Sequence, residues 1–202
     1  MLNKEGALAG KSTMDSEQRD KIYQDCIKQL GYEILFPLWL GNRTLYAVKI
    51  DEKIRVAKLG SPRFPKSAKQ VRTESKTLAA AEGIQGVVQN ISYHKLFQDQ
   101  VKVDVLIREY VEGANLREEG VLNKEQHSRL KGTIRALHQR GITHLDLHDE
   151  NVLISREGIP YLFDFGVAKF KRELCLRDYQ IYEREDQLDL QNLFNDYKAP
   201  KY

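Results

Sequence analysis

The sequence predicts an α+β fold in which an antiparallel five-stranded sheet with one long helix is followed by a smaller, mainly helical part. Five strand-like segments lie between residues 33 and 110, with one helical segment among them. After Gly113 the apolar residues change to the spacing of an amphipathic helix. The chain has 202 residues, of which 41% are hydrophobic and 30% charged, so it can bury a core of ordinary globular size.

The predicted elements begin with a helix over residues 17–30. Its apolar residues recur at helical spacing from Ile22 to Leu30, and Gly31 ends it. Residues 1–15 are polar with scattered glycines, so we expect a flexible N-terminus.

Three strands at 33–40, 45–50 and 54–59 follow as an antiparallel meander. They are rich in branched and aromatic residues, and turn-forming sequences separate them. A basic, proline-containing loop over 60–69 then leads to a helix over 70–82.

Two further strands, at 87–96 and 101–110, complete the sheet and meet at a polar turn. The smaller part is predicted to contain a long helix, two short strands and a C-terminal amphipathic segment, at 123–140, 152–155, 161–164 and 183–196. The apolar face of the last segment is predicted to consist of Leu188, Leu190, Leu193 and Phe194.

The clearest chemistry lies in the stretch 144–154 and in the tripeptide 164–166. Together they place an acid, a carboxamide and a second acid at fixed spacing, at Asp146, Asn151 and Asp164. Phosphoryl transfer needs such a set, because one carboxylate orients the hydroxyl nucleophile while amide and carboxylate oxygens hold Mg²⁺ on the nucleotide.

The same string, His-Leu-Asp-Leu-His-Asp-Glu-Asn followed by Asp-Phe-Gly, resembles the catalytic loop and metal-binding motif of the protein-kinase superfamily. The steps of five positions from Asp146 to Asn151 and thirteen to Asp164 are those of eukaryotic-type protein kinases. The resemblance implies a two-lobed protein-kinase-like fold, with an N-lobe over 16–111 that has an extra N-terminal helix and a minimal C-lobe over 112–202. It also implies ATP with Mg²⁺, or Mn²⁺, as cofactors.

Lys58, at the end of the third strand, is the candidate for the ammonium that clamps the α- and β-phosphates. Lys49 lies in an equally similar local sequence, but a third strand ending there would leave too little chain upstream for two strands and a turn. Glu74 in the following helix can pair with Lys58 and fix its direction. Glu82 is a weaker candidate for this pair, and the alternative for Glu74 is a solvated helix charge.

The segment 106–113 resembles a kinase hinge, where the chain crosses between the lobes. The resemblance implies that backbone groups of Glu109 and Val111 bind the adenine edge. Ala57 and Leu153 would then cover the two faces of the base, in a pocket with apolar walls and a few polar groups.

Two further residues have open roles. His148 could contact a phosphate, or it could be a structural loop residue. Asp189 resembles the buried aspartate that accepts backbone N–H groups from the catalytic loop and so holds Asp146 in place. The alternative for Asp189 is a solvated acid on a helix.

The sequence departs from the protein-kinase pattern at three points. Gly41 is the one glycine between the first two strands, where kinases usually have three over the phosphates. Leu145 replaces an arginine that usually grips a phosphorylated activation loop, which predicts activity without such phosphorylation. Only 36 residues follow Gly166. The chain is therefore more similar to minimal atypical kinases, namely RIO kinases, the small kinase of the tRNA-threonylcarbamoylation complex and bacterial lipopolysaccharide-core kinases.

The complete catalytic set favours an ATP- and Mg²⁺-dependent kinase that phosphorylates Ser or Thr hydroxyls of a protein, itself included. One alternative is a small-molecule or lipopolysaccharide-core sugar kinase, which the short tail favours. Another is an ATP-binding regulatory scaffold or ATPase, which the weak phosphate loop favours. The basic segment 60–72 could meet an anionic partner, or it could be a solvated loop.

The net charge of +3 does not by itself indicate nucleic-acid or membrane binding. The sequence has no apolar run near the ~20 residues of a membrane helix and no visible secretory signal. Cys26 and Cys175 lie in no motif, which favours free thiols in a cytoplasmic setting over a disulfide.

Overall fold

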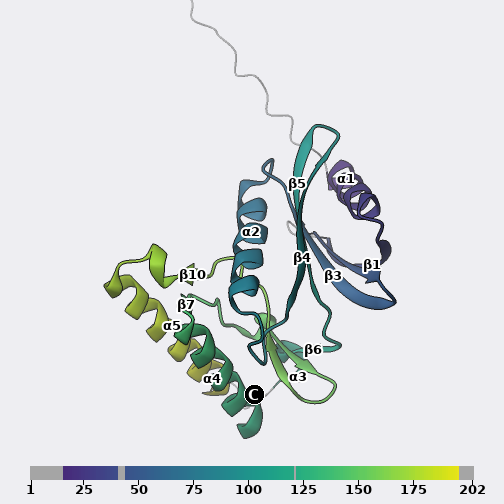
Figure 1. The fold of residues 1–202 in the computed structure, drawn as a ribbon. Coiled ribbons are helices and arrows are strands. Elements are labelled where there is room, and N and C mark those ends of the chain that lie inside the picture. Colours follow the sequence, from purple (N-terminus) through teal and green to yellow (C-terminus); the bar gives the residue numbers. More distant parts are fainter. Residues whose placement is uncertain (1–15, 41–43, 121, 196–202) are drawn as a thin grey trace, which may run out of the picture.

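An antiparallel sheet of five strands forms the larger lobe, with one helix against each face (Figure 1). The computed structural model describes residues 16–40, 44–120 and 122–195. The predicted flexible N-terminus and Gly41 lie outside these residues. Two long helices, side by side, and two small sheets make up the second lobe (Figure 1). The predicted α+β class, with its five-stranded sheet and mainly helical second lobe, is confirmed.

Two hairpins of the large sheet close with tight turns, at residues 51–52 and 99–100. Strands β1 to β5 span Glu33–Leu40, Thr44–Ile50, Lys53–Gly60, Asn90–Gln98 and Val101–Glu109, in the order β1-β2-β3-β5-β4. The backbone φ is 47° at Asp51 and 61° at Glu52, and 48° at Asp99 and 61° at Gln100. Two successive residues with positive φ form the type I′ turn that matches the twist of a hairpin. The register of β2 on β3 and of β4 on β5 is therefore fixed locally.

The two faces of the sheet have different neighbours, because side chains alternate along a strand. Helix α1, Ser16–Gln29, packs on one face, where Tyr23 lies in a buried cluster with Val105 of β5. Helix α2, Pro65–Ala80, packs on the other face, where Leu78 shares a second buried cluster with Leu106 of β5. The even-numbered residues of β5 therefore face α2.

Helix α2 begins earlier than predicted. It spans Pro65–Ala80, so its first turn includes residues of the predicted loop 60–69. Proline suits this position because its fixed φ is already helical and the first N–H groups have no partner within the helix. Lys66 and Lys69 consequently lie on a helix. A Cβ at Gly60 would come within 2.8 Å of the Ser67 carbonyl, so glycine allows β3 to end directly against α2.

The second lobe is built around two long helices. Helix α4, Lys124–Gln139, begins at a capping box in which Asn123 and Gln126 exchange side chain–backbone hydrogen bonds of 2.9 Å. Helix α5, Leu176–Asn195, begins earlier than the predicted segment 183–196. The shorter elements are β6 Gly113–Asn115, α3 Leu116–Glu119, β7 Ile142–Thr143, η1 Asp149–Asn151, β8 Val152–Ser155, β9 Pro160–Leu162, β10 Lys169–Phe170 and η2 Lys171–Glu173.

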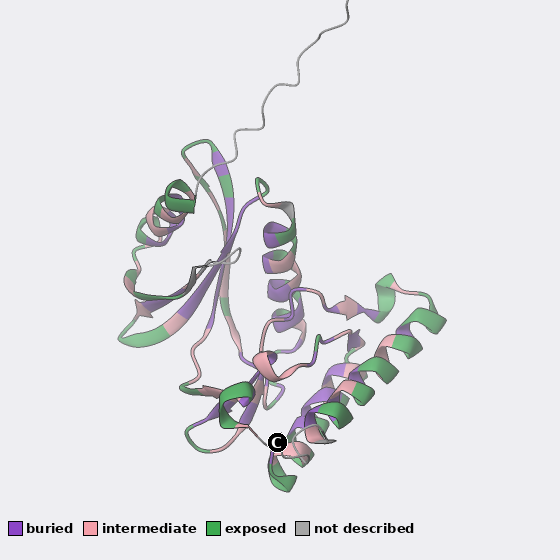
Figure 2. Cartoon of the chain, turned by 180° about the vertical axis from the view of Figure 1, so that it is seen from behind, coloured by how far each residue is buried: buried purple, intermediate pink, exposed green. Residues whose placement is uncertain are grey.

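The buried face of α5 differs from the predicted one. Tyr179, Asp186, Leu190 and Leu193 are buried and recur at helical spacing, whereas Leu188 is 47% exposed. The prediction that Leu188 belongs to the apolar face was wrong. Figure 2 shows the central strands mostly buried, while α5 exposes much of its outer side.

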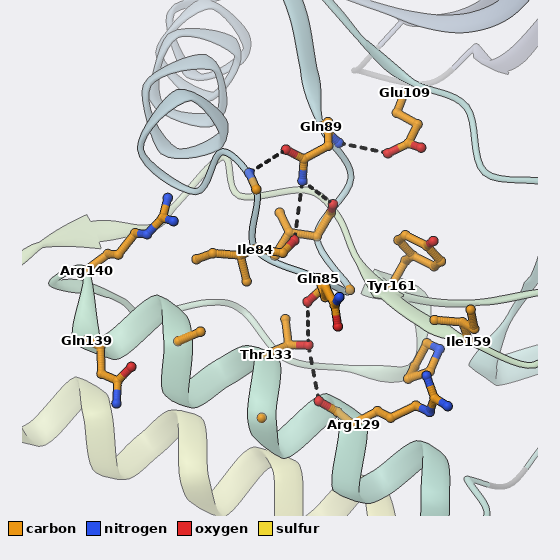
Figure 3. A pocket seen from close by; sticks show the side chains of 16 residues that line it. Ile84, Gln85, Gln89, Glu109, Arg129, Thr133, Gln139, Arg140, Ile159 and Tyr161 are labelled. Carbon is orange, nitrogen blue, oxygen red and sulfur yellow. Dashed lines mark hydrogen bonds between the residues drawn. The ribbon is translucent and has the colours of Figure 1, made fainter.

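The loop 83–89, which connects α2 to β4, contacts the second lobe (Figure 3). The Thr133 hydroxyl of α4 donates to the Gln85 carbonyl at 2.9 Å. The side-chain amide of Gln89 donates to the Val87 carbonyl at 2.7 Å. A guanidinium nitrogen of Arg140 donates to the carbonyls of Ala80 and Glu82, at 2.8 and 2.7 Å, and so ties the end of α2 to the end of α4. A hollow of about 1030 Å³ lies between this loop, α4 and β9.

Two expectations from the composition can be compared with this fold. Both cysteines are free thiols, with Cys26 buried and Cys175 exposed. Within the described residues, the helices are too short or too polar to span a membrane.

Candidate active site

Three segments that are distant in the sequence meet at Lys58. Lys58 lies near the end of β3 and is 2% exposed, and its ammonium forms an ion pair with the fully buried Glu74 of α2. The same ammonium lies 2.8 Å from Oδ1 of Asp164, which follows β9. The rival lysine, Lys49, instead pairs with the exposed Glu52 at the β2–β3 turn. A buried ammonium between two carboxylates is thus the centre of the site.

The alternation of side chains on β3 explains how Lys58 reaches α2. Lys58 pairs across the sheet with Leu106, and Val56 pairs with Arg108, so these four residues share the face that meets α2. Ala57 points to the opposite face and is fully buried in the cluster under α1. The prediction that Ala57 covers the adenine was therefore wrong, because it was one residue out of phase with Lys58. Val56, on the same face as Lys58, lies where Ala57 was predicted to lie.

The proposed hinge is tied to the loop behind it. The Glu109 backbone N–H donates to the Gln89 carbonyl at 2.8 Å, and the Glu109 carboxylate accepts the Gln89 N–H at 3.1 Å (Figure 3). The Glu109 N–H therefore already has a partner and is not available to the edge of a base. Val111 and Leu153 are half-buried. A Cβ added at Gly113 would lie 2.9 Å from Leu153, so this side chain packs directly against the end of the hinge segment.

The catalytic-loop candidates have unusual backbone conformations. The φ angles of His144, Asp146 and Asp164 are 57°, 55° and 62°, in the left-handed region that non-glycine residues rarely adopt. Such conformations persist where the surrounding contacts hold them, and they cluster at functional sites. All three residues belong to the catalytic and metal-binding motif predicted from the sequence.

A buried carboxylate beneath the loop supplies those contacts. Asp186 of α5 is 1% exposed. It accepts the Leu145 N–H at 2.7 Å, the His144 N–H at 3.0 Å and the Thr143 hydroxyl at 2.9 Å. Nε2 of His138 lies 2.8 Å from the same carboxylate. Asp186 therefore binds the peptide N–H groups before and after the Cα of His144, the first residue of the loop with positive φ.

Asp186, and not Asp189, thus holds the loop, which corrects the role considered for Asp189. Asp189 is half-buried, and its pKa is raised by burial first and then by repulsion from Asp186, Glu185 and Asp146. The sequence contains a signal for the right residue. Asp186 falls on the same helical spacing as Leu190 and Leu193, and an acid within a buried stripe requires hydrogen-bond donors.

Hydrogen bonds link Asp146 to the metal-binding candidates. The side-chain amide of Asn151 donates to the Asp146 carbonyl at 2.9 Å. The N–H of Phe163, next to Asp164, donates to the Asn151 carbonyl at 3.3 Å. The Asp146 carboxylate is 47% exposed, and its Oδ2 lies 3.9 Å from Nε2 of His148, which is itself 42% exposed. His148 therefore lies beside the proposed base, at the open side of the site.

The donor set suits a hard divalent cation. Asn151 and Asp164 offer amide and carboxylate oxygens, which Mg²⁺ prefers. No group of three or more His, Cys, Asp or Glu side chains suited to a metal occurs in the described part of the chain. Mg²⁺ in nucleotide sites is usually bound through one or two protein ligands plus phosphate oxygens. The residues therefore fit a metal that arrives with a nucleotide better than one held by protein alone.

A second charged residue next to Lys58 had no predicted role. Arg108 of β5 is 8% exposed, and its Nε lies 3.5 Å from Oε1 of Glu74. The sequence signal is a charge at the end of the strand-like run that contains Leu106 and Ile107. Such a charge must find a partner if both faces of the strand are covered.

A small basic hollow adjoins the site. It has a volume of about 310 Å³, and its lining includes Lys66 and Lys69 of α2 together with His144 and Lys169. Among the residues that line it there is no acid. The basic segment expected from the sequence therefore faces the catalytic loop through the first turns of α2.

Comparisons with known proteins agree with this geometry. The family model described as the protein kinase domain matches residues 40–180. A probable serine/threonine-protein kinase of Bifidobacterium longum is 35% identical over 84 residues, which cover 37% of this chain and 11% of the relative. A serine/threonine-protein kinase of Schizosaccharomyces pombe is 30% identical over 132 residues, which cover 61% of this chain and 27% of the relative. A cell cycle protein kinase of Candida albicans is 28% identical over 178 residues, covering 83% and 23%. The chain thus spans about a tenth to a quarter of the length of these relatives.

Proposed function

This chain belongs to the protein kinase family, and on that premise we propose that it transfers the γ-phosphoryl group of ATP to a Ser or Thr hydroxyl of a protein. One observation carries the proposal: the buried Lys58 contacts both Glu74 and Asp164, which come from separate segments of the chain. Hydrogen bonds through Asn151 connect Asp146 to the same place. Such a set positions phosphates and a nucleophile and needs little other chemistry from the protein.

Each residue has one role in the proposed transfer. Lys58 binds the α- and β-phosphates, and Glu74 fixes its direction. The carbonyl of Glu109 and backbone groups of Val111 bind the base. The acceptor oxygen bonds to the γ-phosphorus as the bond from that phosphorus to the β-bridging oxygen breaks. ADP leaves, and the hydroxyl proton passes to the carboxylate of Asp146.

Asn151 and Asp164 would hold Mg²⁺ through their side-chain oxygens. When bound, the metal neutralises charge on the β- and γ-phosphates. The ammonium of Lys58, now 2.8 Å from Asp164, lies where it can exchange that carboxylate for phosphate oxygens.

The test is a transfer assay with γ-labelled ATP, Mg²⁺ and a Ser/Thr-rich protein such as casein, followed by mass spectrometry of every labelled product. The chain itself is included among the products, so the assay also detects autophosphorylation. Asp146→Ala should lower transfer by at least about 100-fold, because it removes the group that orients the hydroxyl. It should leave nucleotide binding nearly unchanged, whereas Asp164→Ala should also weaken Mg²⁺-dependent nucleotide binding.

Glu118→Ala is the matched control, since Glu118 is an exposed acid on α3. Its transfer rate should equal that of the wild type. Wild-type turnover in Asp146→Ala would disprove the role of Asp146. ATP hydrolysis without any labelled acceptor would instead favour an ATP-binding scaffold or ATPase.

A kinase of small hydroxylated molecules or core sugars is the second candidate. The observation that favours it is the short connection between Gly166 and Asp186, which contains β10, η2 and the first half of α5. This leaves little chain beside Asp146 on which a peptide could dock. The same labelling reaction, run on hydroxylated metabolites and lipopolysaccharide fragments, separates the two candidates by the product that carries the label.

We further propose that the acceptor is anionic where it meets α2. The support is the basic hollow with Lys66, Lys69 and Lys169. Lys66→Ala with Lys69→Ala should raise the KM for the acceptor and weaken its dependence on salt, while the KM for ATP stays unchanged. An unchanged acceptor KM would contradict this docking site.

A further inference from the structure

Arg108 is a second buried cation on the wall of the site. Its side chain is 9% exposed, and Nε lies 3.5 Å from Oε1 of Glu74. Its guanidinium carbon lies 5.3 Å from the centre of the Phe163 ring, next to Asp164. Within the described residues neither Nε of Arg108 nor Oε1 of Glu74 has a hydrogen-bond partner. Their contact is therefore a charge interaction without a hydrogen bond.

Glu74 consequently lies between two cations. Its Oε2 pairs with Lys58, and its Oε1 faces Arg108. The Glu74 side chain is fully buried, so its charge can hardly be solvated by water. With Asp164, the four side chains form a row of alternating sign whose formal charge is zero.

Lys58 cannot serve every carboxylate once a nucleotide binds. In the proposed reaction its ammonium exchanges Asp164 for the α- and β-phosphates, so it is then shared between these phosphates and Glu74. If Lys58 were the sole partner of Glu74, sharing the ammonium with phosphates would weaken the pairing of a buried carboxylate, which is unfavourable. Arg108 faces the other oxygen of Glu74, so it can remain paired with this carboxylate while Lys58 also binds phosphates.

We infer that Arg108 is a positioning residue that holds Glu74, and with it α2, while Lys58 engages the nucleotide phosphates. This inference rests on the proposed function. It predicts that α2 keeps its place beside the site through Arg108 and needs no other event to bring it there. If Arg108 only filled space, the effect of replacing it would be the same with or without Lys58.

The first test is a set of melting temperatures of the full chain without nucleotide. Lys58→Met and Arg108→Met should each lower the melting temperature moderately, because the other cation still pairs with Glu74. The double variant leaves the buried carboxylate without a cation, so its melting temperature should fall by about 10 °C more than the sum of the single effects. Adding Glu74→Gln to the double variant should restore most of this loss. Additive effects, or no restoration by Glu74→Gln, would overturn the inference.

The second test separates positioning from packing through nucleotide affinity, measured calorimetrically with ATP and Mg²⁺. Arg108→Met should raise the Kd about tenfold, a change of about 1.4 kcal/mol. Arg108→Lys should stay within about threefold of the wild type, because its ammonium reaches roughly the position of the guanidinium carbon. Arg135→Met, at an exposed arginine of α4, is the control and should bind as the wild type does.

Two outcomes of the second test are decisive in different ways. Wild-type affinity in Arg108→Met would overturn the positioning role. A wild-type chain that binds no nucleotide would overturn the proposed function, and the melting temperatures would still decide whether Arg108 and Lys58 share Glu74.

Discussion

The carboxylate of Asp186 should contribute more to stability than any other single acid on α5. Replacing it with alanine removes the acceptor for the Leu145 N–H at 2.7 Å, the His144 N–H at 3.0 Å and the Thr143 hydroxyl at 2.9 Å. The site is 1% exposed, so water cannot easily replace the lost acceptor. Hydrogen bonds to charged groups contribute about 1.5–3 kcal/mol each, but they are not additive within one network.

We therefore expect Asp186→Ala to lower the free energy of unfolding by about 4 kcal/mol, measured by urea denaturation. The melting temperature should fall by roughly 8–16 °C for a chain of this size. Asp186→Asn keeps the volume and one oxygen acceptor, so it should cost about 2–3 kcal/mol. If the proposed function holds, both variants should also lose transfer activity, because the backbone of His144 and Leu145 is no longer anchored.

Two neighbouring variants make the result specific. Glu185→Gln, at an exposed acid one residue away, should change the free energy of unfolding by less than about 0.5 kcal/mol. Burial, and then repulsion from neighbouring acids, raises the pKa of Asp189. Asp189→Asn removes the charge that both effects disfavour, so it should be neutral or slightly stabilising. A larger loss in Asp189→Asn than in Asp186→Asn would refute this account of the loop.

Three further predictions concern the fold. Burial raises the pKa of Cys26 to about 11, so at pH 8 a thiol reagent should label Cys175 alone in the folded chain and both cysteines in urea. Burial raises the pKa of Tyr23 from 10.0 to about 12, so the folded chain keeps a proton that the unfolded chain loses. This contribution is complete below pH 10 and should disappear between pH 10 and 12, on the order of 2 kcal/mol in denaturation curves, and Tyr23→Phe should lose less stability over that range. Asn123→Ala should lower the free energy of unfolding by about 1 kcal/mol through loss of the capping box, and an unchanged denaturation midpoint would contradict that role.

The elements with a strong local signal could be predicted from the sequence. The strands of the large sheet alternate or form apolar runs between polar turns, and their observed bounds lie within a few residues of the predicted ones. Helix α4 has both a periodic apolar face and a cap at Asn123. The start of α2 was missed because proline and lysine residues indicated a loop, although proline is also favoured in the first turn of a helix. Strands of two or three residues, such as β7 and β10, contain too few positions to show a period.

The site was predictable as a set of residue types and less so as a set of contacts. The spacing of Asp146, Asn151 and Asp164 depends on the chain between them, so the motif carries it. The error at Ala57 came from a face assignment, since a shift of one residue along a strand moves a side chain to the other side of the sheet. The charge contact of Arg108 with Glu74 joins residues 34 positions apart on different elements, and no local pattern encodes it.

The two hydrogen bonds from Arg140 to the carbonyls of Ala80 and Glu82 fix the C-terminal end of α2, so a tilt of this helix would pivot at that end. The helix has 16 residues and is therefore ~24 Å long, so a tilt of about 5° would displace its far end by ~2 Å. Glu74 lies only six residues from the C-terminal end of α2 and would move by less than ~1 Å in the same tilt. Lys66 and Lys69 lie in the first turns of α2, where the displacement is larger. A swing of this helix would therefore reshape the basic hollow strongly while hardly disturbing the ion pair of Glu74 with Lys58.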